Sequence, residues 1–218
     1  MENFGPDQEG VIKYRLEHRQ AALADDLDIA EINAWRSVFH RLRLIGKIPE
    51  KYDGLGFGNI SRRLVPGHPE FIISGTQTGH LPSLDKSDFA MIESASPERN
   101  SIRSTGSTPP SSEALTHASV YLHDRSVNAV IHVHSPELWR QSRRLNLASI
   151  AADIPYGTPE MACEVASLLE SDHLRTRGIF VMLGHEDGVV AFAATLPDAA
   201  TLLIAQFAKA LSLEQNQS

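Results

Sequence analysis

The chain has 218 residues, of which 42% are hydrophobic and 22% charged, a balance typical of a globular domain with a full hydrophobic core. Its formal net charge of -7 argues against a nucleic-acid-binding face. Its sole cysteine, Cys163, excludes an internal disulfide and any zinc site built from several cysteines. The N-terminal segment lacks the apolar core of a signal peptide, and no apolar run approaches the roughly 18 residues of a membrane span. We therefore expect a cytoplasmic protein without nucleic-acid or membrane partners.

The first quarter of the chain is predicted to contain one helix. We expect residues 1–25 to be an N-terminal arm, because residues 1–23 are charged and lack a clean period, as in a loose segment or a short helix. Residues 26–218 are expected to form a single domain. Its first helix is predicted from Asp26 to Gly46, where glycine would stop it. The apolar stripe of this helix consists of Ile32, Trp35, Val38, Phe39, Leu42 and Ile45.

The next segment reads as strands joined by turns. Alternation over residues 60–64, the turn at 66–69 and the apolar residues 71–73 predict an antiparallel hairpin. Ser74, Gly75 and Thr76 form a turn of small residues, in which backbone N–H groups can approach a ligand. Further elements are a strand over 89–92 and a loop over 97–110 with a brief strand near Ile102.

The second half alternates helices and strands. Serine at residues 111–112 would cap a helix that runs to Asp124, and Thr158 would cap another that begins at Pro159. The other elements are a strand over 129–134, a short helix over 136–143, strands over 178–183 and 189–192, and a final helix from Thr195 to about Leu213. This order predicts an α/β fold with three layers, α/β/α, around a central, mostly antiparallel sheet. Neither a glycine-rich dinucleotide motif nor a phosphate-binding P-loop is present.

Two histidines in the strand over 129–134 are candidate metal ligands. Residues two apart on a strand share a face, so His132 and His134 point to the same side while Ile131 and Val133 point to the other. The same pattern also fits two polar residues at the exposed end of a strand. A catalytic zinc usually has three protein ligands. His185, in a glycine-flanked turn between two apolar strands, is the best-placed third histidine, although a turn histidine can also simply face water.

The predicted helix start at residues 111–113 is a candidate anion site. A helix N-terminus with the hydroxyls of Ser111 and Ser112 suits an anionic group, which would bring its neighbouring atoms near Glu113. Glu113 alone would be an ordinary acidic residue in the first turn of a helix. His117 lies one turn later on the same face, where we expect hydrogen bonding or packing within the helix.

Several short motifs occur along the chain: Gly58-Asn59-Ile60-Ser61, Ser74-Gly75-Thr76, Pro110-Ser111-Ser112-Glu113, His132-Val133-His134-Ser135 and Gly157-Thr158-Pro159-Glu160. In order and spacing they resemble the motifs of the class II aldolase/adducin family. The resemblance spans roughly residues 28–212 and is far more specific than any one motif. The family includes fuculose-phosphate and rhamnulose-phosphate aldolases, ribulose-phosphate 4-epimerase and methylthioribulose-phosphate dehydratase.

The resemblance implies a metal-dependent enzyme, commonly a homotetramer with sites at subunit interfaces. It implies a divalent metal, zinc or another ion such as Mn²⁺, on His132, His134 and His185. It gives Glu113 the acid/base role. The positions that match those holding the substrate phosphate are Asn59, Ser74, Gly75, Ser111 and Ser112.

One departure from the family concerns the third ligand. Where the family usually has Asn-His-Gly, this chain reads Gly184-His185-Glu186-Asp187-Gly188, with two residues inserted after the histidine. Glu186 or Asp187 would then be within reach of the site. A tyrosine that some aldolases donate from a neighbouring subunit has no clear counterpart, since Tyr156 is near the right stretch but offset.

The resemblance implies a lyase of the aldolase type. Its substrate would be a phosphorylated sugar or a related hydroxy-keto compound that reacts through a metal-stabilised enediolate. Epimerisation, dehydration and decarboxylation use the same combination of metal and acid/base group, so these activities stay open. The alternative from another class is a non-catalytic binding module like the adducin head.

Overall fold

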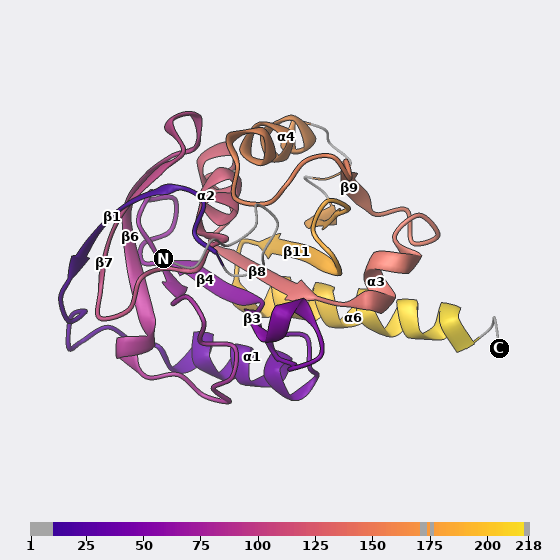
Figure 1. Cartoon of the computed structure of the whole chain (residues 1–218), viewed down its shortest axis with the longest axis horizontal. Coiled ribbons are helices and arrows are strands. Elements are labelled where there is room, and N and C mark those ends of the chain that lie inside the picture. Colours follow the sequence, from indigo (N-terminus) through magenta and orange to yellow (C-terminus); the bar gives the residue numbers. More distant parts are fainter. Residues whose placement is uncertain (1–10, 171–173, 175–176, 216–218) are drawn as a thin grey trace.

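The computed structural model describes residues 11–170, 174 and 177–215. Within them, nine strands form one sheet (Figure 1). The strands are β1 (Arg15–Gln20), β4 (Asn59–Arg63), β5 (Phe71–Ser74), β6 (Phe89–Ser96), β7 (Ser101–Gly106), β8 (Ala129–His134), β9 (Ala148–Ile150), β10 (Ile179–Met182) and β11 (Gly188–Ala193). Their order across the sheet is β1-β7-β6-β5-β4-β8-β11-β10-β9. Only β1–β7 and β9–β10 pair in parallel, so the predicted mostly antiparallel sheet is confirmed.

Helices cover both faces of this sheet. On one face α2 (Ala114–His123) packs against α4 (Pro159–Leu169). The other face carries α1 (Ala30–Arg41), α3 (Pro136–Gln141) and α6 (Leu196–Gln215). Figure 1 shows α2 and α4 above the sheet and α1 and α6 below it. The three-layer α/β/α prediction is therefore confirmed.

The central strand β8 supplies apolar side chains to both layers. Val130 belongs to the buried cluster under α2 and α4. Ile131 and Val133 belong to the cluster under α1 and α6. All three are completely buried, and each such side chain contributes about 1.5–3 kcal/mol to folding. The middle of the sheet is consequently packed from both faces, which suits it to hold a functional side chain in a fixed position.

The expectation of a loose arm or short helix at the N-terminus is wrong for residues 15–20. They form β1, which pairs in parallel with β7 from Arg15–Ser101 to Gln20–Gly106. Leu16 and His18 are half-buried while Arg15 and Glu17 are exposed. A charged edge strand buries little apolar area, so its sequence has no strong hydrophobic period. Residues 1–10 of the expected arm lie outside the described residues.

The first helix is shorter than predicted, and Gly46 does not end it. Arg43 adopts the left-handed conformation with φ 60°. The Arg43 N–H donates to the His40 carbonyl at 3.0 Å and the Leu44 N–H to the Phe39 carbonyl at 2.9 Å. These two bonds form a Schellman C-cap, which usually has glycine where Arg43 stands. Gly46 instead starts a two-stranded ribbon of β2 (Gly46–Lys47) and β3 (Gly56–Phe57).

The predicted hairpin is confirmed as β4 and β5, which pair antiparallel. The brief strand expected near Ile102 is confirmed as β7 at Ser101–Gly106, and the strand expected over 89–92 is longer than predicted, because β6 continues to Ser96. On β7 the consecutive residues Ser104 and Thr105 are both buried, so small polar side chains are covered on both faces of this strand. No helix in the described part of the chain is both long and apolar enough to cross a membrane.

Candidate active site

Three histidines meet at the centre of the sheet. His132 and His134 come from β8, and His185 comes from the turn between β10 and β11, which pairs with β8 so that Gly188 lies opposite His134. The ligand-type atoms of the three side chains all lie within 4.8 Å of one another. None of the three is more than 3% exposed. The structure thus excludes the two alternative interpretations, namely that His132 and His134 lie at an exposed strand end and that His185 faces water.

The strand β11 sets the protonation of His132. The His132 Nδ1–H donates to the Val189 carbonyl at 3.2 Å, because a carbonyl oxygen can only accept. This leaves the His132 Nε2 as the unprotonated nitrogen, and that atom is buried without a hydrogen-bond partner. Burial also lowers the pKa of His132 to about 4. His132 is therefore a neutral imidazole with a free lone pair.

The other two imidazoles are also held neutral. Burial lowers the pKa of His134 and His185 well below the ordinary value, and the neighbouring histidines lower each pKa further. Their Nε2 atoms are 3.0 Å apart. Neutral imidazole is the form that binds a metal ion.

The residues fit a divalent metal ion. Nitrogens bound to one zinc ion at about 2.0–2.1 Å in tetrahedral geometry are about 3.3 Å apart. The 3.0 Å separation of the His134 and His185 nitrogens is close to this value. The buried, unpartnered Nε2 of His132 is the donor that such an ion would satisfy.

Glu113 faces the same cluster from α2. Its Oε2 accepts a hydrogen bond from the Thr116 hydroxyl at 2.9 Å. Its Oε1 is buried, has no hydrogen-bond partner and lies 4.0 Å from the His185 Nε2. Burial raises the pKa of Glu113 to about 7, against the lowering effects of the Thr116 bond and the positive charge of Lys13. A carboxyl group beside three neutral imidazoles can bind a cation or exchange a proton.

The helix cap differs from the prediction. Glu113 itself is the N-cap residue of α2, and its side chain makes no capping bond. The Ser111 hydroxyl accepts from the Glu113 N–H at 3.3 Å, one step before the helix begins. A serine hydroxyl therefore does bond to a backbone N–H group here, but the donor belongs to Glu113 and not to the first turn of the helix.

Four of the five predicted anion-binding residues, all except Ser74, line one narrow polar pocket beside the cluster. Asn59 pairs with His132 across β4 and β8, and Ser112 precedes Glu113, so the pocket adjoins the three histidines. The lining is formed by Gly56, Gly58, Asn59, Gly75, Thr76, Gln77, Thr78, Gly79, Ser111 and Ser112. No lysine or arginine is among these lining residues, so an anion here would be held by neutral donors.

Ser74 lies at the end of β5, next to this pocket. Its hydroxyl oxygen accepts from the Ile60 N–H at 3.2 Å, which leaves the hydroxyl hydrogen available. The turn that follows does not offer the expected backbone donors. The Gly75 N–H donates to the Asp88 carbonyl at 2.7 Å and the Thr76 N–H to the Pro109 carbonyl at 2.9 Å. Gly75 is instead needed for space, because a Cβ there would lie 2.6 Å from the Thr108 Cγ2.

Arg36 fixes the loop that forms one wall of the pocket. Its buried guanidinium donates from α1 to the Thr78 carbonyl at 2.7 Å and to the Leu81 carbonyl at 2.6 Å. Desolvation lowers the pKa of Arg36 to about 10, so the group stays charged at neutral pH. This residue was not singled out in the sequence, because a charged residue on a helix is usually exposed.

His117 bonds outside its helix, contrary to the prediction. Its Nδ1 is 2.7 Å from the Ser61 hydroxyl on β4, and that hydroxyl also lies 2.8 Å from the Tyr121 hydroxyl. The network ties α2 to the sheet underneath Glu113. His173 lies outside the described residues.

Aromatic rings surround the histidines. The Tyr156 ring lies 4.7 Å from that of His185, and the Lys13 Nζ is 3.8 Å from the Tyr156 centroid. The Tyr52 ring lies 4.5 Å from that of His134, and the Phe57 ring 5.2 Å from it. Apart from Tyr156, none of these residues was predicted, since no local motif marks a contact between distant parts of a chain.

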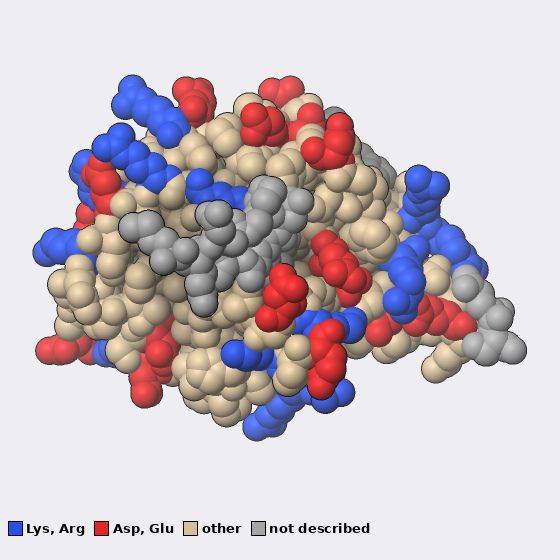
Figure 2. All heavy atoms as spheres, viewed as in Figure 1, with Lys and Arg blue, Asp and Glu red and all other residues tan. Residues whose placement is uncertain are grey.

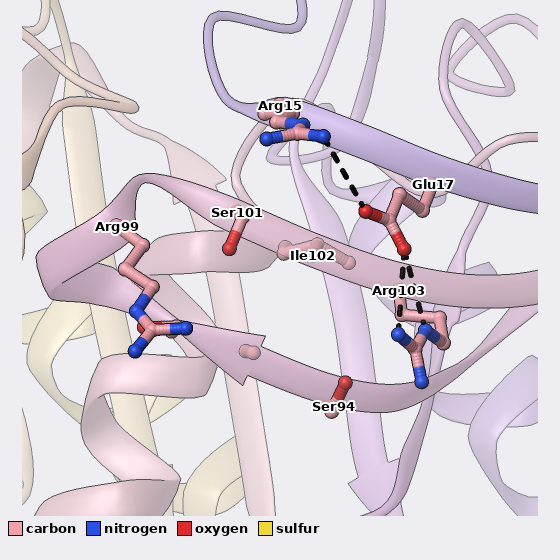
Figure 3. A pocket seen from close by; sticks show the side chains of 9 residues that line it. Arg15, Glu17, Ser94, Arg99, Ser101, Ile102 and Arg103 are labelled. Carbon is pink, nitrogen blue, oxygen red and sulfur yellow. Dashed lines mark hydrogen bonds and ion pairs between the residues drawn. The ribbon is translucent and has the colours of Figure 1, made fainter.

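A larger surface pocket of about 310 Å³ lies away from this cluster, at the edge formed by β1, β6 and β7 (Figure 3). There Glu17 contacts Arg15 at 3.8 Å and Arg103 at 3.4 Å. All three side chains are more than half exposed, so these ion pairs contribute little. Over the face shown in Figure 2, acidic and basic side chains are interspersed.

Comparisons with known proteins identify the family of this chain. Residues 49–209 match the family described as the Class II Aldolase and Adducin N-terminal domain. A methylthioribulose-1-phosphate dehydratase of Methylococcus capsulatus is 32% identical over 106 residues, which are 46% of this chain and 48% of that protein. The chain thus matches about half the length of this curated relative.

Two solved structures are similar along most of the chain. An L-fuculose 1-phosphate aldolase has a TM-score of 0.62 at 19% identity, covering 90% of this chain and 90% of that one. A sugar-phosphate aldolase from Thermotoga maritima has a TM-score of 0.62 at 18% identity, covering 86% and 93%. At these identities the likeness shows a shared fold.

Proposed function

Because the chain belongs to the class II aldolase and adducin family, we propose that it is a divalent-metal-dependent lyase of the aldolase type. Its proposed substrate is a phosphorylated sugar or a related hydroxy-keto compound. The observation that carries the proposal is the buried cluster of three neutral histidines with the unpartnered carboxylate oxygen of Glu113 beside it.

His132, His134 and His185 are the proposed metal ligands, with Zn²⁺ or another divalent ion such as Mn²⁺ as the metal. A bound divalent ion supplies Lewis-acid stabilisation of negative charge on substrate oxygens. The chain's own contribution is a buried site in the middle of the sheet, with His132 oriented by the Val189 carbonyl.

Glu113 is the proposed acid/base residue. Its Oε1 would hold or accept the proton of a substrate hydroxyl, while the Thr116 hydroxyl fixes Oε2 and with it the plane of the carboxyl group. In a retro-aldol cleavage, removal of this hydroxyl proton turns the oxygen into a carbonyl as the adjacent carbon–carbon bond breaks. The electron pair of that bond stays on the other fragment, which then takes up a proton.

The pocket next to the cluster is the proposed anion site. Asn59, Ser74, Ser111 and Ser112 would donate side-chain hydrogen bonds to the substrate phosphate, and Gly75 would keep the turn close-packed. Anchoring the phosphate there would place the neighbouring carbons against the histidines and Glu113, which lowers the entropic part of the barrier.

A second candidate reaction is dehydration. It is supported by the relative named methylthioribulose-1-phosphate dehydratase, which shares 32% identity over 106 residues. This reaction also begins with proton removal by an acid/base group, but a carbon–oxygen bond breaks and water leaves. A non-catalytic module like the adducin head would bind no metal and turn over no substrate.

The test is a screen of sugar phosphates and hydroxy-keto acids with the purified protein and added Zn²⁺ or Mn²⁺. Mass spectrometry of the products separates the reactions, since cleavage yields two smaller carbonyl fragments and dehydration yields one product lighter by one water. We expect cleavage products from a phosphorylated substrate. Absence of bound metal and of turnover with the whole panel would reject the enzyme.

The proposal extends to a homotetramer, on the family resemblance alone, and to a cytoplasmic location, on the sequence features given above, such as the sole cysteine. Light scattering of the purified full chain measures its mass in solution. A mass of about 24 kDa, that of one 23.9 kDa chain, would contradict the tetramer.

A further inference from the structure

The segment before β3 has an unusual backbone. Tyr52, Asp53 and Gly54 are consecutive residues with φ of 51°, 55° and 68°. For residues other than glycine the left-handed conformation costs about 1–2 kcal/mol each, so surrounding contacts must hold it. An observed strain of this kind is a reason to ask what the segment positions.

The strained segment places an aromatic ring against a proposed metal ligand. The Tyr52 ring meets the His134 ring edge-on, with centroids 4.5 Å apart and planes inclined by 74°. Phe57 lies 5.0 Å from Tyr52 and 5.2 Å from His134. The imidazole of His134 is therefore packed against two aromatic rings, whereas that of His132 is oriented by a backbone carbonyl.

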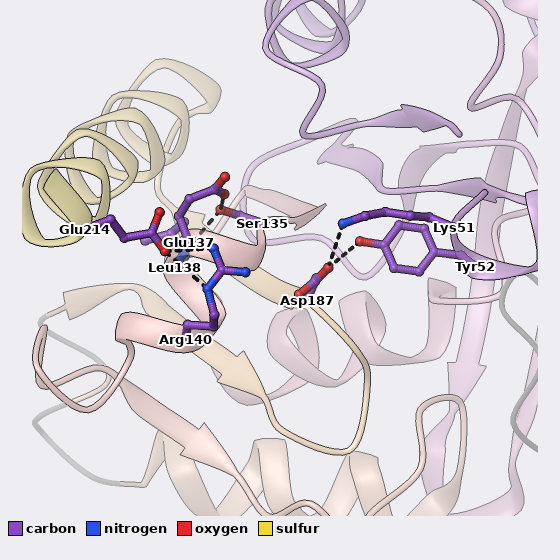
Figure 4. Close-up of polar contacts among 8 residues, drawn as sticks. All are labelled: Lys51, Tyr52, Ser135, Glu137, Leu138, Arg140, Asp187 and Glu214. Atoms are coloured by element: carbon purple, nitrogen blue, oxygen red, sulfur yellow. Dashed lines mark hydrogen bonds and ion pairs between the residues drawn. The ribbon is translucent and has the colours of Figure 1, made fainter. Parts of the chain in front are cut away.

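Asp187 holds Tyr52 in this place (Figure 4). The Tyr52 hydroxyl donates to the Asp187 Oδ2 at 2.6 Å, and the Lys51 Nζ lies 3.6 Å from the same oxygen. The Asp187 side chain is only 9% exposed, so the hydroxyl bond is well shielded from water. The Lys51 side chain is 44% exposed, which makes its ion pair the weaker contact.

The backbone of Asp187 is tied to β8 as well. The Ser135 N–H, next to His134, donates to the Asp187 carbonyl at 2.8 Å. Asp187 has a φ of 61° and follows the exposed Glu186 in the turn after His185. It therefore contacts the neighbourhood of His134 twice, through its carbonyl and, by way of Tyr52, through its carboxylate.

We propose that Asp187 and Tyr52 form a clamp that fixes the imidazole ring of His134. Both are positioning residues, since they act through His134, and the effect on metal binding rests on the function proposed above. The two residues by which this turn departs from the family pattern thus have different roles. Asp187 turns inward to complete the clamp, while Glu186 stays in solvent.

Two pairs of variants test the clamp. The Asp187 pair separates the hydrogen bond to Tyr52 from the negative charge, and the Tyr52 pair separates the hydroxyl group from the ring. Asp187→Gly removes the carboxylate and suits a positive φ, whereas Asp187→Asn keeps an acceptor for Tyr52 and loses only the charge. Tyr52→Phe removes the hydroxyl bond and keeps the ring, whereas Tyr52→Leu removes the ring. Glu186→Gln, in the same turn, is the matched control for loss of a negative charge.

The measurements are the rate at which Co²⁺-loaded protein releases its metal to a chelator, and the NMR shift of the His134 ring protons in the metal-free protein. We expect Asp187→Gly and Tyr52→Leu to release Co²⁺ about 10–100 times faster, the range found for residues that orient a ligand. In both variants the His134 ring protons should move toward the shifts of a mobile imidazole. Asp187→Asn and Glu186→Gln should stay within about twofold of the parent chain, and Tyr52→Phe should lie between.

Unchanged release rates and ring shifts in Asp187→Gly and Tyr52→Leu would overturn the clamp. So would an equal effect in Asp187→Asn, because the carboxylate would then act through its charge. If the parent protein takes up no Co²⁺, the proposed metal centre fails, while the ring shifts of the metal-free variants still decide the clamp.

Discussion

Glu113 has one carboxylate oxygen bonded to Thr116 and the other directed at His185 without a partner. A buried acceptor left without a bond costs about 1–3 kcal/mol, so folding favours the site less than a satisfied interior would. This arrangement lets the free oxygen bond to whatever enters the cluster. A residue that serves only to cap a helix would have both oxygens bonded to backbone or solvent.

Replacing Glu113 by glutamine tests its role as a proton carrier. Glutamine keeps the shape of the side chain and an acceptor for the Thr116 hydroxyl, but its amide cannot take up and release a proton as a carboxyl group does. We expect kcat to fall by about 10²–10⁴ while bound metal, measured by atomic emission, stays near the parent value. Glu160→Gln, an exposed position on α4, is the control. A kcat within about threefold of the parent would contradict the assignment.

The variant Ser112→Ala tests the anion pocket at the level of one hydroxyl. Since the lining has no basic side chain, each neutral donor matters, and we expect KM for the phosphorylated substrate to rise about tenfold. The unphosphorylated analogue should show no such change. Equal changes in KM for both compounds would mean that the pocket does not hold the phosphate.

Element ends account for most of the differences between the predicted and the observed fold. The strand β8 and the helix α4 were predictable, because β8 alternates two buried layers and α4 has the Thr158 cap followed by proline. The strand β1 was not predictable, because its polar residues, such as His18, face polar residues of β7, such as Ser104, at this edge of the sheet. The early end of α1 was not predictable either, because arginine rarely adopts the left-handed conformation that Arg43 has.

Arg43→Gly should stabilise the end of α1. Arg43 is exposed and has a φ of 60°, so glycine relieves a left-handed strain at the cost of a more flexible unfolded chain. We expect a net gain of about 0.5–1 kcal/mol and a rise of about 2 °C in Tm. Arg43→Ala is the control that removes the same side chain without relieving the strain. A lower Tm for the glycine variant would show that the arginine side chain itself supports the cap.

Across the whole molecule, the strand order brings together residues that are far apart in the chain. The central strands β4, β8 and β11 lie side by side, so Asn59, His132 and the turn with His185 share one place in the sheet. The sequence motifs predicted which residues would meet there. They did not predict the clamp, because Tyr52 and Asp187 are 135 residues apart and depend on a strained backbone. The role of each site residue stays a prediction until it is measured.

A metal ion held by the folded chain alone should raise its thermal stability. At about 100 times its dissociation constant a ligand adds about 2.7 kcal/mol, which corresponds to a rise of about 5–10 °C in Tm for a chain of this size. We expect this shift with Zn²⁺ or Mn²⁺ and its loss on adding a chelator. The double variant His132→Gln/His134→Gln should lose both the shift and the bound metal, and full metal occupancy in it would contradict the ligand assignment.

The pairing of β8 with β11 also has a consequence for biosynthesis. When the ribosome has made the chain as far as His134, only two of the three proposed ligands exist, and the third emerges 51 residues later. The strand that orients His132 follows later still, since it begins at Gly188. A metal ion can therefore be captured in full only after nearly the whole sheet has been synthesised. For this reason we expect that incomplete chains that end before β11 do not bind zinc stably during translation.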